Sequence, residues 1–187
     1  MRTSPLSLSL LILLAAPLAL AQDVPPSTGN EPGNAGGLSW TPPKSFTSKL
    51  TEGLRAATYV LPKAKGDTEA PELAVFYFGP GQGGDVDANV RRWSAQLVGK
   101  DGKPVKVTTE RSKIAGFPVT LVKGAGTYRS GGMGISPVVE KPGFRLLGAI
   151  VEGPEGPVFF KLTGPARSVA AAEPDFKKLL ASLAAMG

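Results

Sequence analysis

The segment that decides the fold is residues 73–97, which read LAVFYFGPGQGGDVDANVRRWSAQL. Its first six residues are apolar without interruption, which is typical of an inner strand of a sheet covered on both faces. Val86, Val90, Trp93 and Leu97 then recur at helical spacing, and Asp85 before them is a suitable N-cap. The segment therefore predicts a strand and a helix joined by a glycine-rich turn.

Strand patterns also surround this segment. Apolar residues alternate or cluster in residues 54–61, 117–122, 144–152 and 158–163. For the second of these stretches, a strand that extends to Tyr128 is the open alternative. The last two of these stretches flank Gly153-Pro154-Glu155-Gly156, whose residue types are typical of a hairpin turn. A second amphipathic helix is predicted near the C-terminus, where apolar residues recur at helical spacing from Val169 to Leu183. These patterns predict an α+β fold in which helices pack on a mainly antiparallel sheet.

The first 21 residues have the composition of a secretory signal peptide. Arg2 is their only charge, Leu6 to Leu20 is largely apolar, and Ala21 completes an Ala-Leu-Ala site of the kind that a signal peptidase requires. The apolar run is short for a membrane span, and Pro17 disfavours the alternative of an uncleaved anchor. We therefore expect an extracytoplasmic mature chain, periplasmic or secreted, that begins at Gln22 and has no stable membrane insertion.

The rest of the chain divides into a linker and a domain. Residues 22–37 read QDVPPSTGNEPGNAGG and contain almost nothing to bury, so we expect a disordered linker there. Residues 38–187 contain all the strand and helix patterns and no internal repeat. They are expected to form a single domain.

The chain is basic, with 21 Lys and Arg against 15 Asp and Glu, and its net charge of +6 falls to +5 without Arg2. The one mild concentration of basic residues, from Lys100 to Lys113, is typical of a solvated loop and strand edge. Weak attraction to anionic envelope polymers or lipids is the alternative for this segment. Because no aromatic residues alternate with the basic ones, we expect no nucleic-acid partner.

The sequence contains no histidine and no cysteine. This composition excludes disulfides, a lipid anchor on a cysteine, Ser-His-Asp triads and Cys–His nucleophile pairs. It also removes the ordinary ligands of zinc, copper and haem, so we expect no metal and no cofactor. Stability must then come from a packed core.

Two motif matches are better explained by local structure than by ligand binding. Residues 79–84 satisfy the dinucleotide pattern G-x-G-x-x-G, but Asp85 puts a carboxylate where the pyrophosphate would bind, and no repeated βαβ pattern follows. Residues 85–89 match the start of a calcium loop, but Val90 and Gln96 stand where that loop needs glycine and glutamate. We interpret both matches as a sharp turn followed by a helix cap.

A carboxylate-dependent hydrolase acting on envelope glycans is the catalytic alternative that the composition leaves open. No serine has a lysine three residues on, and no G-x-S-x-G elbow is present. Paired carboxylates remain possible, and the candidates are Glu69, Glu72, Glu110, Glu140, Glu152 and Glu155. Because no catalytic constellation is recognisable, we expect a non-catalytic binding or interaction module of the cell envelope, whose partner is an unknown envelope protein or polymer.

Candidate partner contacts lie in two glycine-rich segments. The first is the turn at residues 79–84, where Gln82 is the side chain able to make contacts. The second, residues 124–143, is predicted to be a long loop, and loops of this length are often functional. Its candidate contact residues are Tyr128, Arg129 and Met133.

Several segments together carry a resemblance to a known family, most distinctively Gly83 to Trp93 and Phe159 to Pro165. The sequence resembles a set of uncharacterised exported bacterial proteins of the PsbP/Mog1-like superfamily over most of residues 38–187. The resemblance implies an α/β/α sandwich with a mainly antiparallel sheet and two or three amphipathic helices. It also implies an extracytoplasmic, non-catalytic role and no residue-level site. Many of these relatives are lipoproteins, and the lack of cysteine sets this chain apart from them.

Overall fold

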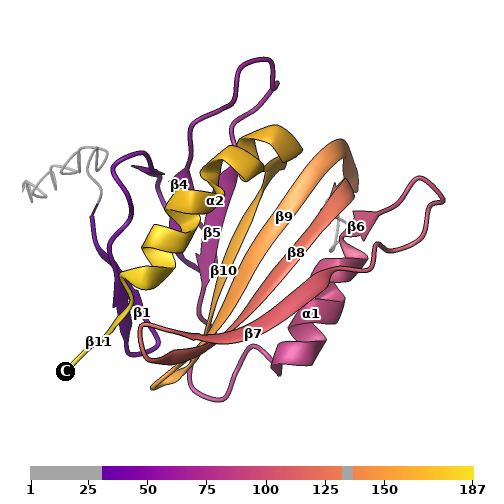
Figure 1. Ribbon diagram of the computed structural model, residues 1–187. Coiled ribbons are helices and arrows are strands. Elements are labelled where there is room, and N and C mark those ends of the chain that lie inside the picture. The colour runs from indigo at the N-terminus through magenta and orange to yellow at the C-terminus, as the bar shows by residue number, and fades with distance from the viewer. Residues whose placement is uncertain (1–30, 132–136) are drawn as a thin grey trace, which may run out of the picture.

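The computed structural model describes residues 31–131 and 137–187 of the chain. They form a main sheet of eight strands, a small sheet of three strands, and the helices α1 and α2 (Figure 1). This architecture confirms the predicted α+β class with a mainly antiparallel sheet. The expected signal peptide and residues 22–30 of the expected linker lie outside the described residues.

The main sheet has the strand order β3-β4-β5-β10-β9-β8-β6, and β7 also pairs with β8. All of its strand pairs are antiparallel. Its strands are β3 (Thr47–Ser48), β4 (Arg55–Val60), β5 (Glu72–Phe76), β6 (Leu97–Val98), β7 (Thr108–Ile114), β8 (Phe117–Ser130), β9 (Val139–Gly153) and β10 (Gly156–Pro165). The predicted inner strand is therefore β5, which pairs with β4 on one side and with β10 on the other.

Helix α2 (Ala166–Ala181) packs on one face of the main sheet and lies across its front in Figure 1. Its residues Phe176, Leu179 and Leu180 belong to a buried cluster that also contains Leu147 of β9 and Phe160 of β10. The small sheet, made of β1 (Gly33–Ala35), β2 (Leu38–Trp40) and β11 (Ala184–Ala185), borders the same core. We call this side of the main sheet the α2 face.

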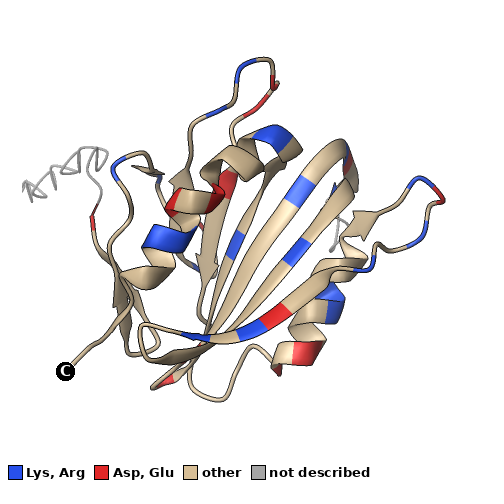
Figure 2. Cartoon of the chain, in the orientation of Figure 1, with Lys and Arg blue, Asp and Glu red and all other residues tan. Residues whose placement is uncertain are grey.

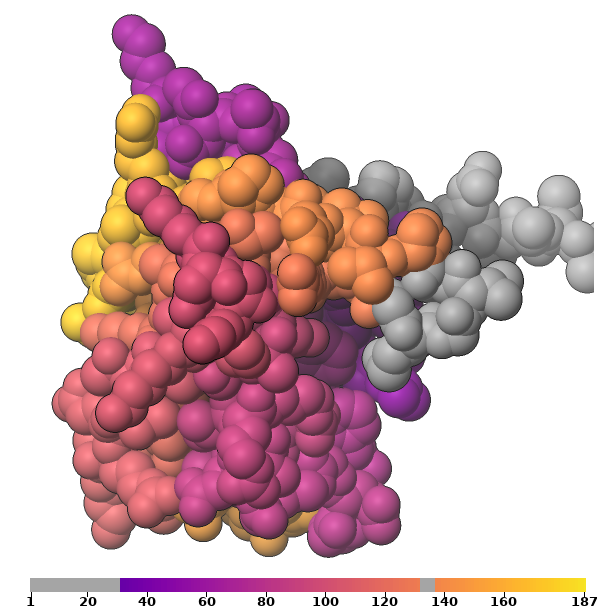
Figure 3. Space-filling model, turned by 90° about the vertical axis from the view of Figure 1, so that its right-hand side faces the viewer, coloured from indigo at the N-terminus to yellow at the C-terminus, as the bar shows by residue number. Residues whose placement is uncertain are grey.

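Helix α1 (Val86–Ala95) packs on the opposite face, which we call the α1 face. As predicted, Asp85 is its N-cap, and the backbone N–H of Ala88 donates to the Asp85 carboxylate at 2.6 Å. Trp93 is the anchor of the helix, because it is 5% exposed and belongs to a second buried cluster with Ile150 and Phe159. Viewed from the side in Figure 3, the magenta segment that contains α1 lies on the lower right of the face toward the viewer.

The close approach of α1 to the sheet depends on Gly148 in the middle of β9. A Cβ atom at this position would lie 2.3 Å from the Trp93 ring, so no larger residue fits while the ring keeps its place. The β9 residues on either side of Gly148, Leu147 and Ala149, belong to the core of the α2 face. This alternation puts the two helices on opposite faces of one sheet.

The predicted loop at residues 124–143 is wrong for most of its length, and the alternative of a strand that extends from Phe117 to Tyr128 is confirmed. Residues up to Ser130 continue β8, and β9 begins at Val139. The glycines in this stretch are required by close packing: a Cβ atom on Gly124 would lie 2.6 Å from Leu97, and one on Gly126 would lie 2.7 Å from a backbone oxygen of β6. In strands, such glycines mark places where another segment approaches the backbone.

The predicted linker, residues 22–37, is also too long at its C-terminal end. Gly33–Ala35 form strand β1, which pairs with β2 in the register Gly33↔Trp40. The backbone there is held by the strand pairing, which composition alone does not reveal.

No helix within the described part of the chain has the length and apolarity that a membrane crossing needs.

Glu173 of α2 contacts three cations, and two of them tie the helix to the sheet. Its carboxylate accepts hydrogen bonds from Lys123 of β8 and Arg145 of β9, each at 2.8 Å, and lies 3.3 Å from Lys177. The Glu173 side chain is 17% exposed. The hydrogen bond from Lys123 and the neighbouring positive charges hold the pKa of Glu173 at about 2, well below its ordinary 4.5.

We expect Glu173→Gln to lower the free energy of unfolding by about 1–3 kcal/mol at pH 7. Because the folded-state pKa is the lower one, this stabilisation is complete above pH 4.5 and is lost as the pH falls toward 2. Urea unfolding at several pH values measures the difference, which should shrink in acid. Glu110→Gln on the exposed side of β7 is the matched control and should change little. A pH-independent loss in Glu173→Gln would contradict the prediction.

Candidate functional site

A polar hollow lies on the α1 face beside helix α1, where the helix leaves the sheet uncovered. We call it the basin, and its volume is about 490 Å³. It lies over β4, β5 and β10, and it extends to the C-terminal end of β8 and the N-terminal part of β9. Its lining residues are Lys49, Arg55, Val60, Glu69, Ala70, Glu72, Ala74, Phe76, Tyr128, Ser130, Lys141, Phe144, Lys161 and Thr163.

Lys161 is the central charge of the basin. It lies in the middle of β10, and its neighbours across the sheet are the small residues Ala74 and Gly148, which leave room above it. Its ammonium group donates to the Gln96 side-chain oxygen at 2.5 Å and to the Tyr128 hydroxyl at 2.9 Å. The same nitrogen lies 5.1 Å from the centre of the Tyr128 ring. Gln96 is the C-cap of α1, so the end of the helix holds one wall of the basin in place.

Two β-bulges direct further cations into the basin. Cross-strand partners share a face of a sheet, and Arg55 of β4 is opposite Phe76 of β5, whereas Ala57 is opposite Val75. Simple alternation would put Arg55 and Ala57 on the same face, but the irregularity between them turns Arg55 to the α1 face. The Arg55 guanidinium then lies 5.8 Å from the centre of the Phe76 ring.

The second bulge is in β9. Phe144 is opposite Gly126 and Lys141 is opposite Tyr128, so β9 uses one residue more than β8 over this interval. Gly143 supplies the positive φ of 70° that this bulge contains. As a result Lys141 and Phe144 share the α1 face, with the Lys141 nitrogen 5.4 Å from the centre of the Phe144 ring.

Two glutamates balance part of this charge. Glu72 accepts a hydrogen bond from Arg55 at 2.7 Å and lies 3.6 Å from Lys49. Glu69 accepts one from Lys141 at 2.5 Å. Within residues 31–131 and 137–187, Lys161 forms no ion pair with an acidic residue. The basin therefore contains a partly buried ammonium group without a counter-charge.

The surroundings alter the acid–base properties of the basin. Burial, followed by the positive charges of Arg55 and Arg92, lowers the pKa of Lys161 from 10.5 to about 8. Burial also raises the pKa of Tyr128, so the phenol stays protonated and remains a hydrogen-bond partner. The described residues contain no cluster of acidic side chains suited to holding a metal ion. This arrangement is suited to binding a negatively charged group through hydrogen-bond donors that are already held in position.

The structure brings only one of the predicted contact residues into this site. Tyr128 lines the basin, although it lies in a strand and not in the expected loop. Arg129 points away from the basin and pairs with Glu140 at 2.7 Å. Gln82 is exposed in the turn before α1, at the opposite end of the helix from Tyr128. Met133 lies outside the described residues.

The structure also places two other features that the sequence analysis singled out, Gln82 and the basic stretch from Lys100 to Lys113. Gln82 borders a shallow hollow of about 400 Å³ beside the hairpin turn between β9 and β10, which carries the predicted residues Gly153 and Gly156. The basic stretch from Lys100 to Lys113 lies in the β6–β7 connection and in the exposed strand β7. Basic and acidic residues are interspersed along the chain, and basic residues also lie within strands of the main sheet (Figure 2).

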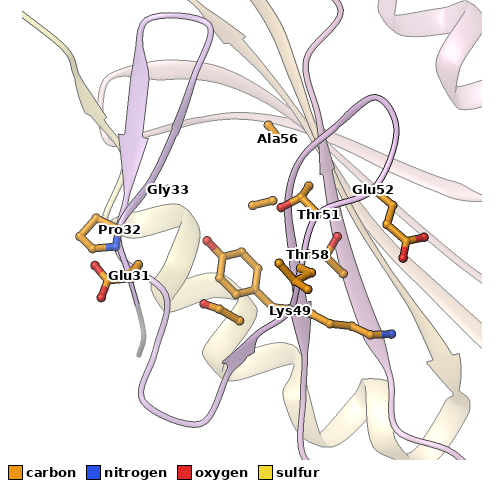
Figure 4. A pocket seen from close by; sticks show the side chains of 12 residues that line it. Glu31, Pro32, Gly33, Lys49, Thr51, Glu52, Ala56 and Thr58 are labelled. Carbon is orange, nitrogen blue, oxygen red and sulfur yellow. The ribbon is translucent and has the colours of Figure 1, made fainter. Parts of the chain in front are cut away.

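A third hollow, of about 590 Å³, lies between β1 and the segment that connects β3 to β4. Figure 4 shows that the charged ends of Lys49 and Glu52 point away from Pro32 on its opposite wall. The other lining side chains are Glu31, Tyr59 and a set of small, hydroxyl-bearing or apolar ones that includes the exposed Leu50. It has no arrangement of polar groups comparable to that of the basin.

The sequence interpretation did not identify Lys161, Arg55 or Lys141 as site residues. A signal for Lys161 is present, because it interrupts the apolar run Phe159-Phe160-Lys161-Leu162 in a predicted strand, where a lysine needs a special environment. Of the candidate glutamates, Glu69 and Glu72 line the basin. Arg55 and Lys141 have no comparable signal, because the bulges that place them are properties of strand pairing.

Comparisons with known proteins give remote structural neighbours. No protein-family model matches the sequence. No curated protein matches it either. CyanoP, the cyanobacterial PsbP of Synechocystis sp. PCC 6803, has a TM-score of 0.49 and 10% identity over 80% of this chain and 87% of its own. The protein of unknown function PA94 from Pseudomonas aeruginosa has a TM-score of 0.45 and 17% identity over 70% of this chain and 82% of its own.

A third solved structure, from Bacteroides thetaiotaomicron, has a TM-score of 0.41 and 12% identity over 82% of this chain and 47% of its own. At such identities a likeness concerns the fold alone. None of the three bears on the residues of the basin.

Proposed function

We propose that this protein is a non-catalytic binding module of the bacterial cell envelope and that the basin is its binding site. The observation that carries the proposal is Lys161, a partly buried ammonium group in a preformed hollow with no acidic partner among the described residues. Burying a charge without a counter-charge costs free energy, and such groups are usual where a ligand completes the site. The extracytoplasmic location rests on the leader-like residues 1–21.

The proposal includes membership of the exported PsbP/Mog1-like proteins that the sequence resembles. The α+β fold and the PsbP neighbour support this assignment at the level of architecture. The resemblance carries no site, so the proposed site rests on the basin alone.

A carboxylate-dependent hydrolase is the second candidate, because Glu69 and Glu72 line the same hollow. Both glutamates are held by cations, Glu69 by Lys141 and Glu72 by Arg55 and Lys49. Each carboxylate is therefore already occupied by a cationic side chain and would have to give up that partner to contact a glycosidic bond. This argument favours binding over hydrolysis.

A variant in which a bulky side chain fills the basin tests the binding function. We expect Ala70→Trp, which puts a large ring into the basin without removing a charged group, to abolish binding of ligands from a soluble envelope extract. Amide chemical shifts of the ¹⁵N-labelled domain would be recorded with the extract and with a peptidoglycan digest. Changes should centre on Lys161 and Tyr128 in the unmodified protein. Ala171→Trp on the exposed side of α2 is the matched control and should respond like the unmodified protein.

Two outcomes would contradict this assignment. An equal response in Ala70→Trp would move the site elsewhere, to the turn at Gln82 or to the basic stretch from Lys100 to Lys113, where binding would weaken steeply with salt. Release of products from peptidoglycan or polysaccharide that stops in Glu72→Gln would establish the hydrolase instead.

A further inference from the structure

The charges that line the basin do not balance. Four cationic side chains, Lys49, Arg55, Lys141 and Lys161, face two acidic ones, Glu69 and Glu72. Both glutamates are already engaged by Arg55, Lys49 and Lys141. The excess is therefore two positive charges, and Lys161 contributes one that has no acidic partner among the described residues.

The hydrogen bonds of Lys161 leave it one donor. An ammonium group has three N–H donors, and those of Lys161 reach Gln96 and Tyr128. Both of these partners are neutral, so neither offsets the charge. A further acceptor that enters the basin would satisfy the third donor, and a negatively charged acceptor would also supply the missing counter-charge.

The size of the basin indicates more than a single ion. At about 490 Å³ it is in the range of small-molecule sites and is many times the roughly 30 Å³ that one water occupies in the liquid. Its walls carry the aromatic rings of Phe76, Tyr128 and Phe144, together with the small side chains of Ala70 and Ala74. The basin therefore has surface that is complementary to a charged group of a ligand and surface that is complementary to a less polar part of it.

We propose that the basin binds a small molecule through a carboxylate or phosphate group that accepts a hydrogen bond from Lys161 and supplies its counter-charge. The inference rests on the proposed function, in which the basin is the binding site. Arg55 and Lys141 lie on either side and add to the attraction, while their glutamate partners hold them in position.

The affinity should depend on pH through Lys161. The ionisable groups around it are Tyr128 of β8, Arg92 of α1, Arg55 of β4 and Glu72 of β5, with Lys49, Glu69 and Lys141 at the rim. Its pKa of about 8 means that the ammonium loses its proton as the pH rises from 7 to 9, while arginine stays charged. A bound anion favours the charged form, so ligand binding should raise this pKa.

The experiment is calorimetric titration of the full domain with succinate, with glycerol phosphate and with neutral glycerol at pH 7. We expect succinate, glycerol phosphate or both to bind, and glycerol not to bind. Lys161→Met should raise the Kd at least tenfold, as loss of a charge-assisted hydrogen bond does. Lys177→Met, an equal loss of charge on α2 with its side chain 59% exposed, should change it less than twofold. Succinate affinity should also fall about tenfold between pH 7 and 9.

The readouts separate this inference from the proposed function. Binding of succinate alone identifies a carboxylate ligand, and binding of glycerol phosphate alone identifies a phosphate ligand. The inference is overturned if neither anion binds at the basin, or if affinity is unchanged in Lys161→Met and with pH. Should an extract component still shift the basin amides and fail in Ala70→Trp, the binding function would stand with a different ligand class. Amide spectra of Lys161→Met report whether it is folded, and the pH series of the unmodified protein tests the role of Lys161 without any substitution.

Discussion

Trp93→Ala is expected to lower the free energy of unfolding by about 3–5 kcal/mol, the usual cost of removing a large buried aromatic side chain. Trp93 is 5% exposed and fills the space between α1 and the sheet above Gly148. Without the ring, α1 loses its anchor, and Gln96 at the end of the helix loses its position beside Lys161. Urea unfolding followed by circular dichroism measures the loss.

Two further variants make the prediction specific. Arg91→Ala, on the exposed side of the same helix, should stay within about 0.5 kcal/mol of the unmodified protein. Gly148→Ala should destabilise the unmodified protein, because its Cβ would lie 2.3 Å from the Trp93 ring, but it should cost less in the Trp93→Ala background. A loss below about 1 kcal/mol in Trp93→Ala would mean that α1 does not pack as described.

Trp40→Ala should have a comparable effect on the other face, again about 3–5 kcal/mol. Trp40 is 1% exposed and meets Phe160 edge-on at 5.1 Å between ring centres. Its indole N–H donates to the Tyr59 hydroxyl at 3.0 Å. A Cβ atom on Gly33 would lie 2.3 Å from the Trp40 ring, so the ring also packs against β1. Chemical denaturation measures the total.

The contributions of the ring and of its hydrogen bond can be separated. Trp40→Phe keeps an aromatic ring beside Phe160 but removes the donor to Tyr59, and we expect it to cost about 1–3 kcal/mol. Trp40→Ala should cost clearly more, because it also leaves a cavity. Equal losses in the two variants would show that the hydrogen bond, and not the packing of the ring, dominates.

The sequence determined the parts of this fold that depend on local pattern. The apolar run of β5, the helical spacing of α1 and the Asp85 cap all predict elements that the structure contains, because each is encoded by residues close together in the chain. The hairpin turn at residues 153–156 is predicted for the same reason. Local pattern did not predict the structure of residues 124–143. The glycines there allow β6 to pack closely on the backbone, and they do not form a flexible loop.

The candidate site was decided by tertiary structure. Lys161 of β10 and Tyr128 of β8 come within hydrogen-bonding distance through the pairing of both strands with β9, and the packing of α1 on the sheet adds Gln96. Arg55 and Lys141 reach the basin through bulges at Arg55/Ala57 and opposite Gly126/Tyr128. A bulge reverses which face a side chain occupies, and it arises from the register between two strands. The period-2 pattern of a single strand therefore assigns such residues to the wrong face, and only the paired sheet places them at the site.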